Sequence, residues 1–180
     1  MIASERSQNI IIVLTISVAI IGSGFMVGNA SFYGGTYALT ERLEVSLANI
    51  YVGNIDPGNL STRPLISLVF NMRITLQVEG NARITFLGAT VWLNDDLLSL
   101  MAFASTPSLA DQYLHSDYNK NVTMTQSAGP PDDNQAVWDA YTSSTWAWNV
   151  TLRYSMIVFD VADTIKWCYV DYYTTNFTLA

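Results

Sequence analysis

The sequence predicts a mainly β protein: an antiparallel, fibronectin-like β-sandwich of about seven strands behind one N-terminal transmembrane helix. Three observations support this prediction. Residues 10–27 form an uncharged apolar run, apolar side chains fall on consecutive even positions from Ile66 to Val78, and a second alternating set extends from Trp146 to Val158. The first run has the length of a membrane span, and the other two have the period of half-buried strands.

Composition limits the class of protein. Half of the 180 residues are hydrophobic and 13% are charged, which fits one domain plus a membrane anchor. The formal net charge of -7 disfavours nucleic acid as a partner, and no Lys or Arg lies between Arg83 and Lys120 to form a basic patch. Cys168 is the single cysteine, so no disulfide forms within the chain, and we interpret it as a small buried side chain.

The apolar run divides the chain. We expect a short cytoplasmic tail over 1–9, a transmembrane helix over 10–27 in contact with lipid, a flexible stalk over 28–41 and a β-sandwich over 42–180. At about 1.5 Å per residue the helix covers roughly 27 Å, close to a hydrocarbon core of about 30 Å. Gly34 and Gly35 favour a flexible stalk, and three of its aromatic residues are candidates for an interfacial belt: Phe32, Tyr33 and Tyr37.

Three fates of this helix remain open. A retained anchor is favoured, because the apolar regions of cleaved signals are shorter, about 7–15 residues. Gly28-Asn29-Ala30 would serve as a signal cleavage site. In the third case, processing near Arg6-Ser7 would release a filament subunit whose helix packs in the fibre core. Archaeal pilin precursors usually carry Lys or Arg followed by Gly or Ala there, and Ser7 departs from that pattern.

Glycosylation triplets indicate the side of the membrane. Charges flanking the run are balanced and give little orientation signal. Asn-x-Ser/Thr triplets are more frequent than the roughly two that composition gives by chance. We expect an extracytoplasmic C-terminal domain, the alternative being chance triplets in an Asn-, Ser- and Thr-rich chain. The candidate acceptors are Asn29, Asn59, Asn121, Asn149 and Asn176.

The first half of the domain contains three predicted strands. Leu43 to Leu47 begins the first. Ile66 to Val78 and the segment from Ala82 form a predicted hairpin around the turn residues Glu79-Gly80-Asn81. Near Gly88 the alternation changes phase, which indicates a bulge or bend.

The second half contains a short strand, a helix and a second hairpin. Val122 and Met124 mark the strand, and Asp132-Asp133 are predicted to cap a helix over 135–141. The strand from Trp146 to Val158 turns near residues 160–163. Its hairpin partner is predicted to point these residues inward: Ile165, Trp167, Tyr169, Tyr173 and Phe177.

The pattern resembles the water-stress and hypersensitive-response (WHy) domain of the late-embryogenesis-abundant superfamily. The resemblance covers 43–179 and includes a first strand over 43–52, the strand Pro64 to Asn71 and the segment Val91-Trp92-Leu93-Asn94-Asp95. Met72 stands where the family usually has Pro, and Asp95 where it usually has Gly. The resemblance implies a fibronectin-like sandwich, often behind one membrane helix, without enzymatic activity.

Candidate catalytic or metal-binding chemistry is sparse. His115 lies between Asp111 and Asp117, the minimum for a general base, but a solvated loop histidine is the better interpretation. The pairs at 95–96 and 132–133 lack the ligand spacing of a calcium loop, so turns and caps explain them better. Four tryptophans are candidates for carbohydrate stacking, although alternation favours core packing: Trp138, Trp146, Trp148 and Trp167.

Three functional hypotheses follow. The favoured one is a membrane-anchored, surface-displayed, non-enzymatic β-sandwich that acts as a structural or interaction module, either an envelope protein or an accessory subunit. It would have a protein partner or self-associate, and no catalytic, cofactor-binding or metal-ligating residue is assigned. The alternative is a subunit of an archaeal-type surface filament. An enzyme that uses His115 ranks last, because the sequence contains no nucleophile-elbow, phosphate-loop, dinucleotide-binding or zinc-protease motif.

Overall fold

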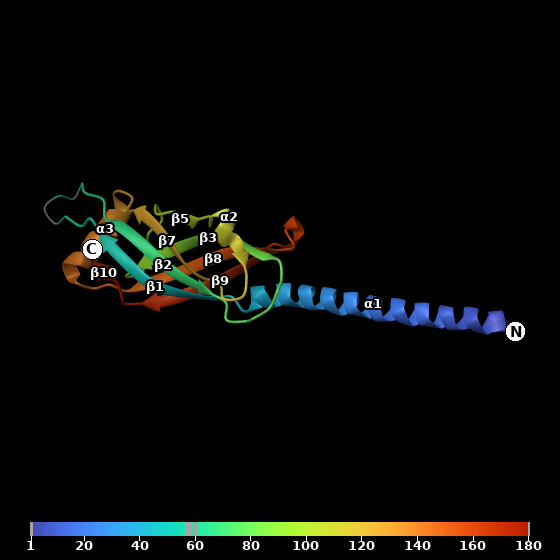
Figure 1. Ribbon diagram of the computed structural model, residues 1–180. Coiled ribbons are helices and arrows are strands. Elements are labelled where there is room, and N and C mark those ends of the chain that lie inside the picture. The colour runs from blue at the N-terminus through green and yellow to red at the C-terminus, as the bar shows by residue number, and fades with distance from the viewer. Residues whose placement is uncertain (1, 57–58, 60, 180) are drawn as a thin grey trace.

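A computed structural model describes residues 2–56, 59 and 61–179, with side chains from residue 7 onward in the first helix. Helix α1 (Ile2–Glu41) projects from one end of a β domain (Figure 1). The strands form two sheets, and the core side chains come from both. The predicted fold class, a mainly β protein with one N-terminal apolar helix, is therefore confirmed.

The first sheet has the order β10-β1-β2-β7. It consists of β1 (Glu44–Gly53), β2 (Leu65–Arg73), β7 (Asn119–Ser127) and β10 (Thr178–Leu179). The second sheet has the order β4-β3-β8-β9, with β5 and β6 also paired to β3. Its long strands are β3 (Ala82–Leu93), β8 (Trp148–Val158) and β9 (Lys166–Thr174), and its short ones are β4 (Asp96–Leu97), β5 (Phe103–Ser105) and β6 (Tyr113–Leu114). The described part of the chain also contains three short helices: α2 (Leu109–Gln112), α3 (Asp132–Ser143) and the 3-10 helix η1 (Ala162–Thr164).

The alternating residues of β2 and β8 form the centre of the core. On β2 the even-numbered side chains from Ile66 to Met72 are fully buried, and on β8 Val150 and Leu152 are buried as completely. Because successive side chains of a strand point to opposite faces, period two places every one of these residues between the sheets. The predicted inward faces of both strands are confirmed.

The predicted first hairpin is wrong. β2 ends at Arg73 and pairs with β1 and β7, whereas β3 pairs with β8 in the other sheet. Residues 74–81 cross from one sheet to the other, and Glu79-Gly80-Asn81 lies against α1 instead of forming a hairpin turn. The alternation of apolar and polar residues identifies which face of a strand points into the core. It does not identify the neighbouring strand, because strands of both sheets point their apolar faces into the same core.

The predicted bulge on β3 lies slightly earlier than expected. Its register against β8 shifts between Ile84 and Phe86, and from Leu87 onward the odd-numbered residues face the core. A Cβ atom on Gly88 would come within 2.9 Å of the Phe86 ring. The glycine therefore leaves room for an outward ring instead of forming the bulge itself.

The second hairpin is present, but its second strand has the opposite phase from the prediction. Trp167 lies opposite Ser155, and Tyr169 lies opposite Arg153, both on the outer face. Inward positions belong instead to Cys168, Val170 and Tyr172. The prediction failed because both the odd- and the even-numbered positions of this edge strand carry apolar residues. The larger aromatic residues were expected to point inward, but they lie on the outer face.

Helix α3 begins and ends close to the predicted positions. Its N-cap residue is Pro131, which makes no side-chain cap, so the predicted capping role of the aspartates is wrong. Asp133 instead accepts hydrogen bonds from the backbone N–H groups of Leu100 at 3.1 Å and Gly129 at 3.4 Å. Its side chain is almost fully buried, and it ties the helix to the loop after β4.

Candidate functional site

The outer part of α1 is an exposed apolar surface. An 18-residue window reaches a mean hydropathy of 2.6, and none of it is buried against the rest of the chain. Residues 7–40 contain no Asp, Glu, Lys or Arg. The 40-residue helix is about 60 Å long at 1.5 Å per residue, and its length and composition suffice to cross a membrane. Exposed apolar surfaces of this extent mark sites that contact lipid or other proteins.

The predicted flexible stalk over 28–41 is helical, which is a correction. Helix α1 continues to Glu41 and packs its last turns against the domain, where Leu39 is fully buried and Thr40 nearly so. Gly34 and Gly35 lie inside the helix. Glycine costs an interior helix about 1 kcal/mol relative to alanine, which tertiary packing readily overcomes.

Glycines allow the helix and the domain to approach closely at this joint. A Cβ atom on Gly35 would overlap the carbonyl oxygen of Glu79. A Cβ atom on Gly80 would lie 2.6 Å from the Cα and N atoms of Thr36. Across the same contact, the N–H of Asn81 donates to the hydroxyl of Thr36 at 2.9 Å. We call residues 35–41 together with 79–81 the neck.

An ion pair also links the neck to the sandwich. Lys166, the first residue of β9, donates to the carboxylate of Glu41. This hydrogen bond, together with the Lys166 charge, lowers the pKa of Glu41, and it raises the pKa of Lys166. Both side chains are largely solvent-exposed, so the pair contributes orientation more than stability. The neck thus joins helix and sandwich through packing, a hydrogen bond and an ion pair.

Four aromatic side chains form a cluster next to the neck. Phe159, which follows β8, lies beside three rings of α1: Phe32 at 6.0 Å, Tyr33 at 4.9 Å and Tyr37 at 6.3 Å between ring centroids. All three helix aromatics remain exposed. The structure thus joins the candidate interfacial residues to a fourth ring from the β8–β9 hairpin.

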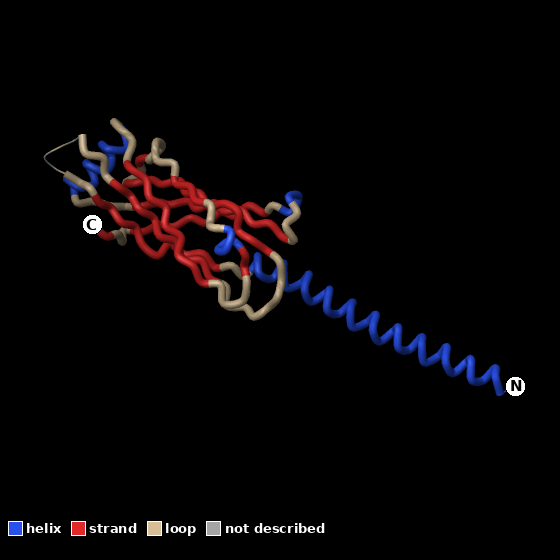
Figure 2. Tube along the Cα trace, turned by 45° about the horizontal axis from the view of Figure 1, so that its top comes forward, coloured by secondary structure: helices blue, strands red, loops and turns tan. Residues whose placement is uncertain are grey.

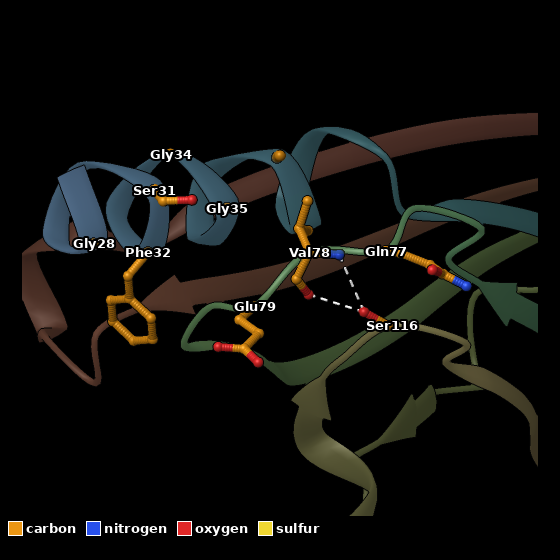
Figure 3. A pocket seen from close by; sticks show the side chains of 10 residues that line it. Gly28, Ser31, Phe32, Gly34, Gly35, Gln77, Val78, Glu79 and Ser116 are labelled. Carbon is orange, nitrogen blue, oxygen red and sulfur yellow. Dashed lines mark hydrogen bonds between the residues drawn. The ribbon is translucent and has the colours of Figure 1, made fainter. Parts of the chain in front are cut away.

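A groove of about 770 Å³ opens beside the same turns of α1. Figure 3 shows Ser31, Phe32 and the glycines of α1 on one wall, and Val78, Glu79 and Ser116 on the other. The hydroxyl of Ser116 donates to the Val78 carbonyl oxygen at 2.9 Å and accepts from the Val78 N–H, with 3.1 Å between N and Oγ. These bonds fix the crossover segment that α1 contacts. The described residues that line the groove include no cluster of titratable groups.

The outer face of β8 and β9 is a second exposed surface. Trp167 is 49% exposed, Tyr169 66% and Tyr173 75%. Arg153 lies 5.5 Å from the centroid of the Phe86 ring, which contacts Trp167 edge to face. In the described part of the chain β9 pairs only with β8, so its other edge has no strand partner. We call Phe86, Arg153, Trp167, Tyr169 and Tyr173 the outer aromatic face.

Asp111 and His115 of the candidate catalytic group contact other residues, and Asp117 lies in a turn. Asp111 binds Lys120 at 2.8 Å and Ser108 at 2.6 Å, and the Lys120 hydrogen bond lowers the pKa of Asp111. His115 contacts the carbonyl oxygen of Ser116 and the ring of Tyr118. Asp117 occupies a left-handed turn position at φ 63°. Within the described residues no cluster of three or more His, Cys, Asp or Glu side chains suits a metal ion.

The remaining candidate residues serve structural roles. Asp95 sits in the left-handed β3–β4 turn at φ 70°, as the turn interpretation predicts. Three of the tryptophans, at 138, 146 and 148, are buried, whereas Trp167 is exposed on the outer aromatic face. Cys168 is half-buried beside Tyr154, and burial and the neighbouring thiol raise the tyrosine pKa.

The glycosylation candidates differ in accessibility. Asn59, Asn121 and Asn176 are exposed on the domain, and Asn29 is exposed on α1 next to the apolar run. Asn149 lies on the outward phase of β8, but its Oδ1 atom is buried and has no hydrogen-bond partner among the described residues. Asn149 and Asn176 line one pocket at the end of the sandwich remote from the neck.

Comparisons with known proteins give no family. No protein-family model matches the chain, and no curated protein matches it. The solved structures that are similar over most of their length include two crystal structures. A protein from Archaeoglobus fulgidus has 6% identity and a TM-score of 0.46, over 73% of this chain and 94% of the other. The putative ApaA protein from Bordetella pertussis has 7% identity and a TM-score of 0.42, over 74% and 94%.

Sequence reasoning missed both the neck and the outer aromatic face. For the outer aromatic face a signal existed: Cys168, Val170 and Tyr172 form an alternative apolar set on β9. For the neck no local signal existed, because Gly35 and Glu79 meet only after folding.

Proposed function

We propose that the chain is a membrane-anchored, surface-displayed interaction module without enzymatic activity. The observation that carries the proposal is the exposed apolar half of α1, in which an 18-residue window is entirely unburied. Placing residues 10–27 in a bilayer removes this surface from water, at a gain of about 25 cal/mol per Å² of apolar area. Lipid is the first partner under this proposal.

An extracytoplasmic position for the sandwich is part of the proposal. Support comes from the exposed acceptor triplets at Asn59, Asn121 and Asn176. The net charge of -7 also disfavours close contact with an anionic cytoplasmic leaflet.

The outer aromatic face is the proposed surface for a protein partner. Exposed Trp and Tyr side chains around an Arg have the composition of interaction hot spots, whereas surfaces that face only water seldom gather large aromatics. The unpaired edge of β9 adds backbone donors and acceptors for an extended partner segment. The resemblance to the WHy domain supports a binding role over a catalytic one.

Membrane fractionation tests the anchor. The full chain is expected to resist extraction by high salt or alkaline carbonate, to dissolve in mild detergent, and to float with lipid on a density gradient. Protease added to intact cells is expected to digest the sandwich. Release of the chain by salt alone, or protection of the sandwich in intact cells, would contradict the proposal.

Affinity purification from mild detergent tests the interaction surface. Replacing Trp167, Tyr169 and Tyr173 by Ser is expected to abolish co-purification of a partner while leaving the thermal unfolding curve nearly unchanged, because the residues are exposed. Tyr51→Ser, at an exposed aromatic on the first sheet, is the matched control. Equal loss in both variants, or in neither, would exclude the outer aromatic face.

A filament subunit is the second candidate, and the neck favours it. Helical assembly requires every head domain to hold one orientation relative to its helix, and the contacts of Gly35 with Glu79 and of Thr36 with Asn81 supply such a joint. A mature chain that begins near Ser7 and sediments as fibres would establish this role. A chain with an intact N-terminus that floats with lipid as single particles would exclude it.

A further inference from the structure

The β8–β9 hairpin reaches further along α1 than the strands around it. Figures 1 and 2 both show its tip, with η1, at the end of the domain that faces the outer part of α1. The contacts of Phe159 with Phe32 and Tyr33 place the start of the tip beside these turns of the helix. Any surface that surrounds α1 at this level also meets the hairpin tip.

The tip carries apolar side chains toward solvent. Val161 is 48% exposed and Ile165 is 50% exposed, one on each side of η1. The hydroxyl of Thr164 donates to the carbonyl oxygens of Val161 at 2.7 Å and Val158 at 2.9 Å. These bonds satisfy backbone groups within the turn. The tip therefore exposes side-chain hydrocarbon with fewer unpaired polar groups than an open loop would present.

The level of the tip matches the bilayer interface. If the span ends at Val27, Phe32 lies five residues later, about 7.5 Å along the axis. The headgroup region adds roughly 5–7 Å on each side of a hydrocarbon core of about 30 Å. Uncharged residues continue to Thr40, so no charge on the helix opposes a slightly deeper position.

Charges near the tip are acidic or already paired. Asp160 accepts from Arg83, which lowers the Asp160 pKa, and Lys166 is bound to Glu41. Asp163 adds another acidic group on η1. Attraction to anionic lipid is therefore not the driving force, and contact must come from apolar and aromatic side chains.

We propose that the hairpin tip is a second membrane contact, so that the domain rests on the bilayer through Val161, Ile165, Phe159 and the aromatics of α1. This proposal rests on the membrane anchoring proposed above and adds a fixed orientation to it. Because the long strands run roughly along the helix axis (Figures 1 and 2), the outer aromatic face is held sideways, toward partners in the same envelope layer.

Depth measurement by spin labelling tests the contact in the full chain. Cys168→Ser removes the native thiol, and single labels are then placed by Val161→Cys, Ile165→Cys, Thr175→Cys and Ile20→Cys. Each protein is reconstituted in phosphatidylcholine vesicles and isolated by flotation. Collision rates with oxygen, which concentrates in lipid, are compared with those of a water-soluble nickel chelate. Thr175 follows β9 at the opposite end of the same hairpin and serves as the matched control.

The oxygen-to-nickel ratio at 161 and 165 is expected to exceed the ratio at 175 several-fold and to stay below the ratio at 20, because the tip lies at the interface and residue 20 lies in the middle of the apolar run. High salt is expected to leave it unchanged. Equal ratios at 161, 165 and 175, with a high ratio at 20, would overturn the tip contact alone. A low ratio at 20 would overturn the membrane anchor itself, so the two failures are distinguishable.

Discussion

Substituting neighbouring glycines of α1 tests the neck. Gly35→Ala introduces a Cβ atom that overlaps the carbonyl oxygen of Glu79, whereas Gly34→Ala introduces one into open space. Both changes favour the helix by about 1 kcal/mol. Only the first meets backbone, and overpacking of this kind costs about 1–3 kcal/mol. The difference between the two variants is therefore about 1–3 kcal/mol in the free energy of unfolding or of undocking.

Thermal unfolding of the full chain in detergent, followed by tryptophan fluorescence, measures this difference. At about 2–4 °C per kcal/mol for a domain of this size, Gly35→Ala is expected to melt roughly 2–12 °C below Gly34→Ala. If the helix lifts away without unfolding the sandwich, tryptic cleavage after the exposed Arg42 accelerates instead. Identical melting and identical cleavage of the two variants would refute the close approach of helix and domain.

A second substitution tests whether both glycines serve one contact. Gly80→Ala places a Cβ atom 2.6 Å from the Thr36 backbone and is expected to weaken the neck by itself. Combined with Gly35→Ala it should cost less than the sum, because a helix already displaced leaves room for the second methyl group. Strict additivity would indicate two independent sites.

Three further predictions concern the sandwich. Leu68→Ala removes a fully buried side chain and is expected to cost about 2–5 kcal/mol in urea unfolding, whereas Leu65→Ala, at a half-exposed position of the same strand, should cost much less. Burial raises the pKa of Asp133 in the folded protein above its unfolded value of about 3.9. The stability that protonated Asp133 contributes is therefore complete below a pH of about 3.9 and is lost as pH rises through the folded pKa. Asp133→Asn should remove this part of the pH dependence of the melting temperature, and an unchanged pH profile in the variant would contradict the prediction. In a host that makes N-glycans, Asn121→Gln is expected to lower the intact mass of the protein by one glycan. Asn149→Gln is expected to leave the glycan mass unchanged, because the Oδ1 atom of Asn149 is buried. Loss of a glycan in Asn149→Gln would contradict this expectation.

Some features of the site followed from sequence and others did not. The apolar run of α1 was predictable because its signal is contiguous in the chain. The contribution of Phe159 to the aromatic cluster was not, since it depends on how the β8–β9 hairpin lies against α1. The face of β9 was also undetermined, because its two alternating sets are both apolar enough to enter a core.

By itself the sequence determined the apolar span of α1 and the inward faces of β2 and β8. A run of apolar residues and a period of two are local properties, and burial of hydrocarbon enforces them whatever the topology. Only the tertiary structure decided that β2 and β3 join different sheets and that α1 continues into a docked neck. Both outcomes depend on contacts between segments that are distant in the sequence, such as Gly35 with Glu79. The free energy of such contacts cannot be inferred from a local sequence pattern.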